Sequence, residues 1–390
     1  MNHGFYFDNA ATTRLHPAAL EAMMPYFADA YANPSSIYRP AQQVRRAIDE
    51  ARKTVAEAIH AKPEEIFFTS GGTEADNWAL KGMVKQGGHL ITTSIEHHGI
   101  FHVAEFLKAT QGAEVTYLPV DDTGMVNPAG LEKAIRPDTS LVSIMLANNE
   151  VGSIQPIRQL AAIAHAKGVP FHTDAVQAVG HIPVYVDELG VDMLSLSSHK
   201  FNGPKGTGAL YVKKGTKLTP SLHGGAQERN RRAGTENVAG IIGMARALEI
   251  SMQEMPKESS RITELRNRLI DEITSTIPHS YLNGPQDNRL PGNVNISFRF
   301  IEGEAILIHL DMHGFQASTG SACSSLSLSP SHVLMAMNRG HELTNGAIRF
   351  SLGIDNTASH ITSLVATLQS SVAKIRSLSP LYDDYLKTQK

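Results

Sequence analysis

Residues 194–200 read Leu194-Ser195-Leu196-Ser197-Ser198-His199-Lys200. An apolar run that ends in small hydroxyls is typical of a strand emerging from a sheet, and a glycine-bearing loop, residues 203–208, follows it. Open α/β sheets present their chemistry at strand ends. A lysine there serves as a nucleophile when its surroundings keep the amine unprotonated. The alternative is that Lys200 is a solvated loop lysine, and this stretch alone favours that alternative. The other stretches of the chain favour the nucleophile.

The surrounding sequence, from about residue 64 to 212, predicts an α/β sheet. Strand-like and helix-like patterns alternate there, and several strands are nearly continuous apolar runs, as in a sheet covered on both faces. We therefore predict a mostly parallel sheet in a large domain. The predicted strands are 66–69, 90–92, 115–118, 141–147, 169–173, 193–197 and 209–212.

The pattern changes near Met255-Pro256-Lys257. A helix is expected over 262–273, then a strand whose apolar residues alternate from Val294 to Phe300, the period of a half-exposed sheet. Helices around 305–312 and 361–375 and a short strand at 347–350 complete a smaller α+β domain. We expect the large domain to span 14–256, and the small domain to comprise 1–13 and 257–390.

One further helix is expected before the sheet, with Val44, Ile48, Val55 and Ile59 on one face. Ser35 or Ser36 is a candidate cap for its start.

Bulk composition limits the classes of function. A chain of 390 residues with 42% hydrophobic and 19% charged residues is typical of a soluble, two-domain protein. The net charge of −3 does not favour nucleic acid or a membrane surface as the main partner. We see neither a signal peptide nor an apolar run near the ~20 residues of a membrane span, so a cytoplasmic location is expected. The lone Cys323 excludes an internal disulfide and a multi-cysteine zinc site, and we expect no metal.

Three strand ends carry candidate binding residues. Residues 69–73, Thr-Ser-Gly-Gly-Thr, form either a phosphate cup, with backbone N–H groups at a helix N-terminus, or an ordinary strand-to-helix turn. They match neither the dinucleotide nor the ATP fingerprint. Asp174 either keeps a pyridine nitrogen protonated or caps a helix. His97 is placed to stack on a planar cofactor and move protons, although it is one of 18 histidines.

Two later residues complete the candidates. Cys323 lies in a small, polar setting that suits a mobile, nucleophilic thiol, unless it is an incidental surface cysteine. Arg349 lies on a strand otherwise built for burial, so it should meet an anion. That anion is either a ligand carboxylate or an internal acid.

Taken together, these stretches resemble the NifS/IscS-type cysteine desulfurases, which are class V, fold-type I pyridoxal-phosphate enzymes. The resemblance runs nearly end to end. It rests on the shared order of residues 6–13, 33–36, 69–74, 96–98, 148–152, 174–177, 197–200, 232–237 and 320–323.

The resemblance implies a fold-type I enzyme that converts L-cysteine to L-alanine and leaves a persulfide on Cys323. Lys200 would hold pyridoxal 5'-phosphate covalently and shuttle protons, and His97 would stack on its ring. The other implied cofactor contacts are Asp174 at the ring nitrogen, Gln177 and Asn149 on the phenolic side, and Gly72, Thr73, Ser197 and His199 at the phosphate, with Thr235 from the other subunit of a homodimer. Arg349, with Asn33 and Asn149, would hold the substrate carboxylate.

The resemblance leaves the sulfur acceptor open between an iron–sulfur scaffold and another sulfur carrier protein. The chain stops soon after residues 379–385, without the longer tail that related enzymes use to dock a scaffold. The residues that follow Cys323 place it with the mobile-cysteine branch of the family. Alternatives are a selenocysteine lyase, another class V enzyme, or a non-catalytic homologue that binds a partner protein. Cysteine-versus-selenocysteine preference stays open too.

Overall fold

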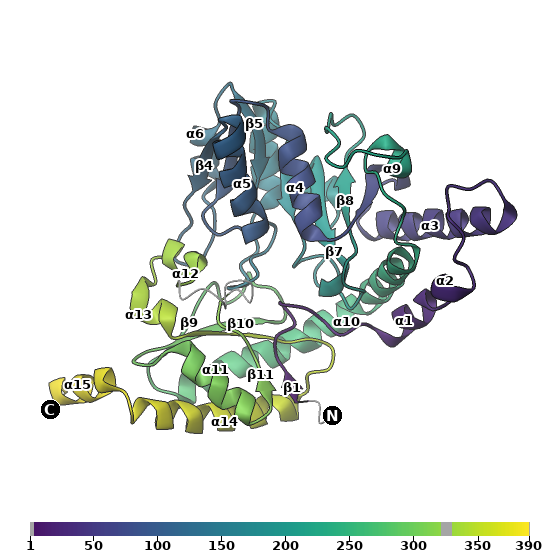
Figure 1. Cartoon of the computed structure of the whole chain (residues 1–390). Helices are drawn as coiled ribbons and strands as arrows, with labels where there is room; N and C mark the ends of the chain where they lie inside the picture. The colour runs from purple at the N-terminus through teal and green to yellow at the C-terminus, as the bar shows by residue number, and fades with distance from the viewer. Residues whose placement is uncertain (1–3, 321–329, 390) are drawn as a thin grey trace.

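The computed structural model describes residues 4–320 and 330–389. Figure 1 shows an α/β part above and an α+β part below, with helix α10 (Val238–Thr276) crossing from one to the other. The two chain ends both lie on the lower part. The buried apolar residues of that lower part form one cluster, which joins Phe7 to residues between 262 and 372. This agrees with grouping the N-terminal residues with the small domain, although the domain boundaries themselves stay a prediction.

The upper part is built on a seven-stranded sheet with the order β2-β8-β7-β6-β5-β3-β4. Strands β3 to β7 pair in parallel, whereas β8 is antiparallel to both of its neighbours. The predicted mostly parallel sheet is therefore confirmed. The strands are β2 (Ile66–Thr69), β3 (His89–Thr93), β4 (Glu114–Leu118), β5 (Thr139–Ser143), β6 (Phe171–Asp174), β7 (Met193–Ser197) and β8 (Gly208–Val212).

Helices cover both faces of this sheet, which explains its nearly continuous apolar strands. Successive residues of β2 point to opposite faces of the sheet. Phe67 packs in an apolar cluster with α4 and α5. Ile66 and Phe68 pack in a second apolar cluster with α3 and α7. The helices of this part are α3 (Arg39–Ala58), α4 (Gly72–Met83), α5 (His98–Gln111), α6 (Pro128–Ala134), α7 (Ile157–Ala166), α8 (Val186–Leu189) and α9 (Gln227–Asn230), with the 3-10 helices η1 (Pro63–Glu65) and η2 (Ser198–Lys200).

Two local predictions in this part are wrong. Strand β5 ends at Ser143 rather than Ala147, and the chain continues as a buried non-strand segment that leads to Asn149. Helix α3 begins at Arg39 after Tyr38, which makes no side-chain capping bond, so neither Ser35 nor Ser36 caps it. Pro40 lies in the first turn of α3, where a missing backbone N–H has no consequence.

Pro256 lies inside α10, so the change in sequence pattern there is not the end of a helix. An interior proline removes a hydrogen bond and costs about 3 kcal/mol. Packing compensates, because α10 contacts α1 (Pro17–Met23) and α3 in the upper part, and α14 (Ala358–Arg376) in the lower part.

The lower part contains a three-stranded antiparallel sheet with the order β12-β10-β9 and a parallel pair, β1 with β11. Its strands are β1 (Phe5–Tyr6), β9 (Ser280–Leu282), β10 (Asn293–Phe298), β11 (Phe315–Gln316) and β12 (Ala347–Ser351). The remaining helices are α2 (Pro25–Ala28), α11 (Gly303–Met312), α12 (His332–Ala336), α13 (Gly340–Asn345) and α15 (Pro380–Thr388).

Strand β10 is buried on both faces, so the predicted half-exposed sheet is wrong here. Its polar side chains point at other polar groups instead of solvent. The amides of Asn293 and Asn295 both donate to the backbone carbonyl of Glu150, at 3.0 and 3.1 Å, and Ser297 accepts from Asn283. The polar half of the alternation therefore joins the lower sheet to the upper part.

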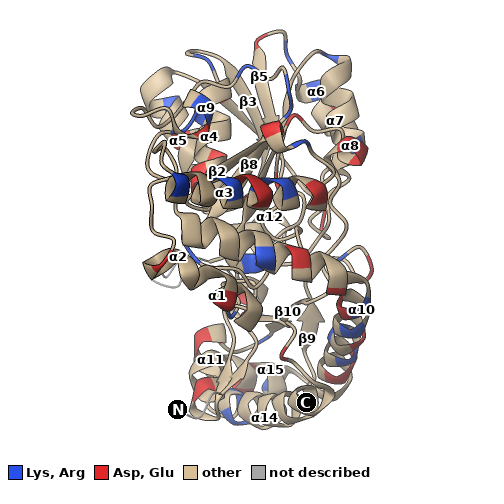
Figure 2. Ribbon diagram, turned by 90° about the vertical axis from the view of Figure 1, so that its right-hand side faces the viewer, with Lys and Arg blue, Asp and Glu red and all other residues tan. Residues whose placement is uncertain are grey.

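Basic and acidic residues are mixed along α3 and α10 in the view of Figure 2, rather than gathered by sign. Within the described part of the chain, no helix is both long and apolar enough to cross a membrane.

Candidate active site

A cavity of about 210 Å³ opens where the carboxyl ends of β6 and β7 meet the start of α4. This is the place in an open α/β sheet where ligands bind. Most of the predicted site residues line it: Gly72, Thr73, His97, Asn149, Asp174, Gln177, Ser197, His199, Lys200 and Arg349. Ala10, Ala11, Asp76, Met145 and Val176 complete its lining.

The turn before α4 has the form of an anion cradle. Gly71 adopts φ +153°, which favours glycine, and a Cβ on Gly208 would lie 2.7 Å from its Cα. The first N–H groups of a helix have no acceptor within the helix, and the helix dipole favours negative charge there. Ser197 and His199 line the same cavity. These donors fit a phosphate group.

Lys200 ends the short helix η2 and lines the cavity, so it is not a solvated loop lysine. Its Nζ donates to the backbone carbonyls of Ala10, at 2.6 Å, and Ala11, at 2.8 Å. Gln177 donates to the same carbonyl of Ala10 at 3.0 Å. The N-terminal segment therefore forms one wall of the site and holds the amine in place.

Asp174 is the last residue of β6 and is buried. One of its carboxylate oxygens accepts the backbone N–H of Val176 at 2.9 Å, so it caps a turn while also lining the cavity. Burial raises its pKa to about 6, opposed by the Val176 hydrogen bond and by the positive charge of Lys200. A ligand nitrogen that carries a proton would stabilise the carboxylate here.

His97 precedes α5 and caps it, with its Nδ1 accepting the backbone N–H of Gly99 at 3.0 Å. Burial, together with the positive charge of Lys200, lowers its pKa to about 4. The imidazole is therefore neutral at pH 7, and its proton sits on Nε2 because Nδ1 is an acceptor. A neutral aromatic ring on the cavity wall fits stacking on a planar ligand.

Arg349 on β12 is 1% exposed. Its position fits both predicted partners, an internal acid and a ligand carboxylate. It pairs with an internal acid, Asp8, at 2.9 Å, and it also lines the cavity. Its Nη1 donates to the carbonyl of Asn149 at 3.2 Å, while its Nε has no hydrogen-bond partner among residues 4–320 and 330–389. The guanidinium thus retains a donor for an anionic ligand.

Among the described residues, two that were predicted for the site, Asn33 and Thr235, do not line this cavity. Asn33 is exposed, and its side chain accepts the backbone N–H of Ser35 at 2.9 Å. Thr235 is also exposed on this single chain, and the resemblance implies that it contributes to a partner subunit's site. Cys323 lies outside the described residues.

Sequence reasoning missed Asp76, a buried acid on the cavity wall. A signal was present, because Asp76 lies four residues after Gly72 and next to Ala75, on the helix face that packs on the sheet. An acid at such a position is rarely without a role.

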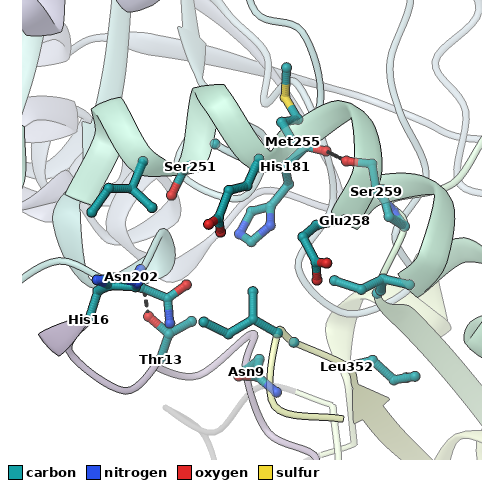
Figure 3. A pocket seen from close by; sticks show the side chains of 18 of the residues that line it. Asn9, Thr13, His16, His181, Asn202, Ser251, Met255, Glu258, Ser259 and Leu352 are labelled. Carbon is teal, nitrogen blue, oxygen red and sulfur yellow. Dashed lines mark hydrogen bonds between the residues drawn. The ribbon is translucent and has the colours of Figure 1, made fainter. Parts of the chain in front are cut away.

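A second cavity, of about 50 Å³, is lined by residues of α10 and by His181 and Asn202. Figure 3 shows the imidazole of His181 pointing into it, across from Thr13, Asn9 and Glu258. The Nε2 of His181 donates to the backbone carbonyl of Lys200 at 2.8 Å. This cavity contains no predicted site residue, so the candidate site is the cavity that Lys200 lines.

Comparisons with known proteins show to which family the chain is similar. Residues 5–364 match the aminotransferase class-V family. The chain is 53% identical over 394 residues to the cysteine desulfurase IscS of Dictyoglomus turgidum, covering 100% of both chains. It is 51% identical over 384 residues to the cysteine desulfurase IscS of Methanosarcina thermophila, covering 97% and 95%.

Solved structures with a similar fold include proteins of the same kind. A NifS-like protein superposes with a TM-score of 0.89 at 38% identity, covering 95% of this chain and 99% of that one. SspA in complex with cysteine superposes with a TM-score of 0.80 at 37% identity, covering 89% and 98%.

Proposed function

Because this chain belongs to the aminotransferase class-V family and is an enzyme of the cysteine desulfurase type, we propose that its Lys200 binds pyridoxal phosphate covalently and that Cys323 takes the sulfur of L-cysteine. The family depends on pyridoxal phosphate. The observation that carries the proposal is the position of the Lys200 amine in one cavity with Asp174 and His97.

The donors around the cavity fit this cofactor. The glycine turn before α4, with Thr73, Ser197 and His199, would hold the phosphate, and His97 would stack on the ring. Asp174 would pair with the ring nitrogen, and Gln177 and Asn149 would face its oxygen side. When bound, the cofactor supplies an electron sink for the substrate carbon atoms.

Arg349 would bind the carboxylate of L-cysteine. A planar guanidinium suits a carboxylate, and burial excludes the water that would otherwise compete. Asp8 fixes the orientation of the guanidinium from its other side. Asn33 and Asn149 are proposed to bind the same carboxylate together with Arg349.

Sulfur transfer would use the Cys323 thiolate as nucleophile. Its sulfur attacks the substrate sulfur, so an S–S bond forms while the substrate C–S bond breaks. The electron pair of the broken bond stays on carbon, which takes a proton, and the products are L-alanine and a persulfide. Lys200 is the proposed carrier of that proton, since its amine lies in the cavity.

Homodimerisation, with Thr235 reaching the partner's phosphate site, belongs to the same proposal. So does transfer of the persulfide sulfur to an iron–sulfur scaffold or a sulfur carrier protein. The cytoplasmic location and the two-domain boundaries stay predictions from sequence.

The test uses purified enzyme supplied with pyridoxal phosphate. We expect a visible absorption band that borohydride bleaches, with the cofactor then found on Lys200 by peptide mass. Lys200→Ala should lose this adduct, and Lys205→Ala, in the exposed loop that follows, is the matched control. Cys323→Ala should keep the band and lose the persulfide. Sulfur transfer that persists in Cys323→Ala would overturn the assigned nucleophile, and selenocysteine turnover by that variant would favour a lyase.

A further inference from the structure

Asp76 is a second acid of the cofactor cavity that the proposed function leaves without a role. It lies on α4 and is 1% exposed. Its Oδ1 lies 3.7 Å from Nε2 of His172, and it has no hydrogen-bond partner in the described part of the chain. A buried carboxyl oxygen without a donor is unfavourable if the group is charged.

His172 links Asp76 to two neighbouring strands. Its ring is fully buried, with Nδ1 2.9 Å from the Ser143 hydroxyl and Nε2 2.9 Å from the Ser195 hydroxyl. Ser195 also faces the Asp76 carboxyl, and its hydroxyl lowers the pKa of that carboxyl by hydrogen bonding, against the larger effect of burial. Four polar side chains from α4, β5, β6 and β7 therefore form one connected chain in the core.

This chain lies directly beside Asp174. His172 and Asp174 are two residues apart on β6, so their side chains project from the same face of the sheet. Ser195 is the register partner of Asp174 on β7. Whatever charge Asp76 carries therefore acts on the carboxylate that we assign to the cofactor nitrogen.

Two buried like charges at one site disfavour each other, so one of the two acids keeps its proton. Asp174 has the backbone N–H of Val176 and the positive charge of Lys200 to stabilise its charged form. Burial raises the pKa of Asp76 well above its ordinary value, and the negative charge of Asp174 raises it further, while the Ser195 hydrogen bond lowers it. Glu96 also faces Asp76, and it adds to the rise only where it is itself ionised. Burial lowers the pKa of His172 to about 3, so the imidazole is neutral and supplies no positive charge.

We propose that Asp76 stays protonated and, through Ser195 and neutral His172, acts as a positioning residue that leaves Asp174 as the single negative charge beneath the cofactor nitrogen. This rests on the proposed function of the cavity. A protonated Asp76 sets the direction of every hydrogen bond from Asp76 to Ser143. The Asp76 hydroxyl donates to Ser195, Ser195 donates to Nε2 of His172, and Nδ1–H of His172 donates to Ser143. A charged Asp76 would instead accept from Ser195 and put the ring proton on Nε2.

The first test reads this tautomer in the enzyme without cofactor. Nitrogen-15 NMR of wild-type protein, with the His172 signals identified by their loss in His172→Gln, should show a neutral ring protonated on Nδ1. A ring protonated on Nε2 overturns the proposal. This readout does not depend on catalysis or on the cofactor.

The second test separates charge from packing in the loaded enzyme. Asp76→Asn keeps the shape and a donor toward Ser195, so we expect cofactor affinity within about twofold of wild type and an unchanged pH midpoint of the cofactor band. Asp76→Leu breaks the chain, and we expect roughly tenfold weaker cofactor binding, which corresponds to about 1.4 kcal/mol. A midpoint lowered by about one unit or more in Asp76→Asn would mean that the native residue is charged.

Failure of the proposed function is distinguishable from failure of this inference. If wild type never forms a borohydride-sensitive band, the cofactor assignment fails, while the tautomer measurement still decides the state of Asp76. If wild type forms the band and Asp76→Asn loses it as Asp174→Asn should, only the inference fails.

Discussion

The guanidinium of Arg349 pairs with the carboxylate of Asp8, with 2.9 Å between Nη2 and Oδ1 and 341 positions between the two residues in the chain. The pair joins strand β12 to the segment after β1, and the same segment supplies the two carbonyls that hold Lys200. This ion pair, between the buried Arg349 and the half-buried Asp8, thus fixes the proposed carboxylate-binding residue relative to the proposed catalytic amine.

Replacement of Arg349 by Gln should raise the KM for L-cysteine by roughly 10-fold to 100-fold, because a charge-assisted hydrogen bond contributes about 1.5–3 kcal/mol. Steady-state kinetics with saturating pyridoxal phosphate measures this. Arg268→Gln, which breaks an exposed pair with Glu272 on α10, is the control and should leave KM unchanged. An unchanged KM in Arg349→Gln would mean that Arg349 does not bind the substrate carboxylate and serves only in the ion pair with Asp8.

Substitution of Gly208 by Ala should disturb the anion cradle. The added Cβ would lie 2.6 Å from the carbonyl oxygen of Leu196 and 2.7 Å from Cα of Gly71, both backbone atoms that cannot move independently. We expect about 1–3 kcal/mol of destabilisation and weaker cofactor binding. Urea unfolding and fluorescence titration with pyridoxal phosphate measure the two effects.

Gly130→Ala is the matched control for that glycine, since it lies in helix α6 and a Cβ there would meet nothing within 4 Å. It should be neutral or slightly stabilising, because alanine is the better helix former. Equal unfolding free energies and equal cofactor affinities in the two variants would show that the backbone does not approach Gly208 as closely as described.

Stability should fall as pH rises through the range set by Glu96. Burial raises the pKa of this fully buried carboxyl to about 8, above its ordinary value of 4.5. Between these two values the folded state holds a proton that the unfolded state has released, so the free energy of unfolding decreases with rising pH, by at most about 1.4 kcal/mol per pH unit.

Glu96→Gln removes this dependence, so the difference in unfolding free energy between the variant and wild type should grow in favour of the variant from pH 5 toward pH 8. Urea denaturation at several pH values measures it. Glu132→Gln, on the exposed face of α6, is the control. A constant difference across the range would show that Glu96 does not hold a proton in the folded state.

The Arg52–Glu228 pair should be among the most sensitive points of the upper part. Two hydrogen bonds of 2.7 Å join the side chains, which are 8% and 2% exposed, and Glu228 also accepts the backbone N–H of Phe68 at 3.0 Å. Arg52→Met leaves a buried carboxylate without its partner, so we expect a loss of about 3–5 kcal/mol.

The double variant Arg52→Met/Glu228→Leu should lose less than the sum of the two single variants, because it removes both charges together. A double-mutant cycle by urea unfolding checks this. Additive losses would indicate that the two residues act independently.

Much of the site was predictable because the relevant signals are local. The apolar runs that become β6 and β7 end at Asp174 and just before Lys200, and parallel strands bring their carboxyl ends to one edge. The glycine turn before α4 lies in the same topological position. Asp76 was missed because helical periodicity marks which face is buried but gives no role to an acid on that face.

The sequence by itself determined where the strands lie along the chain and which polar residues follow each strand. Both signals are local, because periodicity and turn residues act over a few positions. Tertiary structure alone decided that Asp8 reaches Arg349, that α10 continues through Pro256, and that the polar face of β10 is buried. Those outcomes depend on contacts between residues far apart in the chain. Long-range packing and buried hydrogen bonds there outweigh local preference.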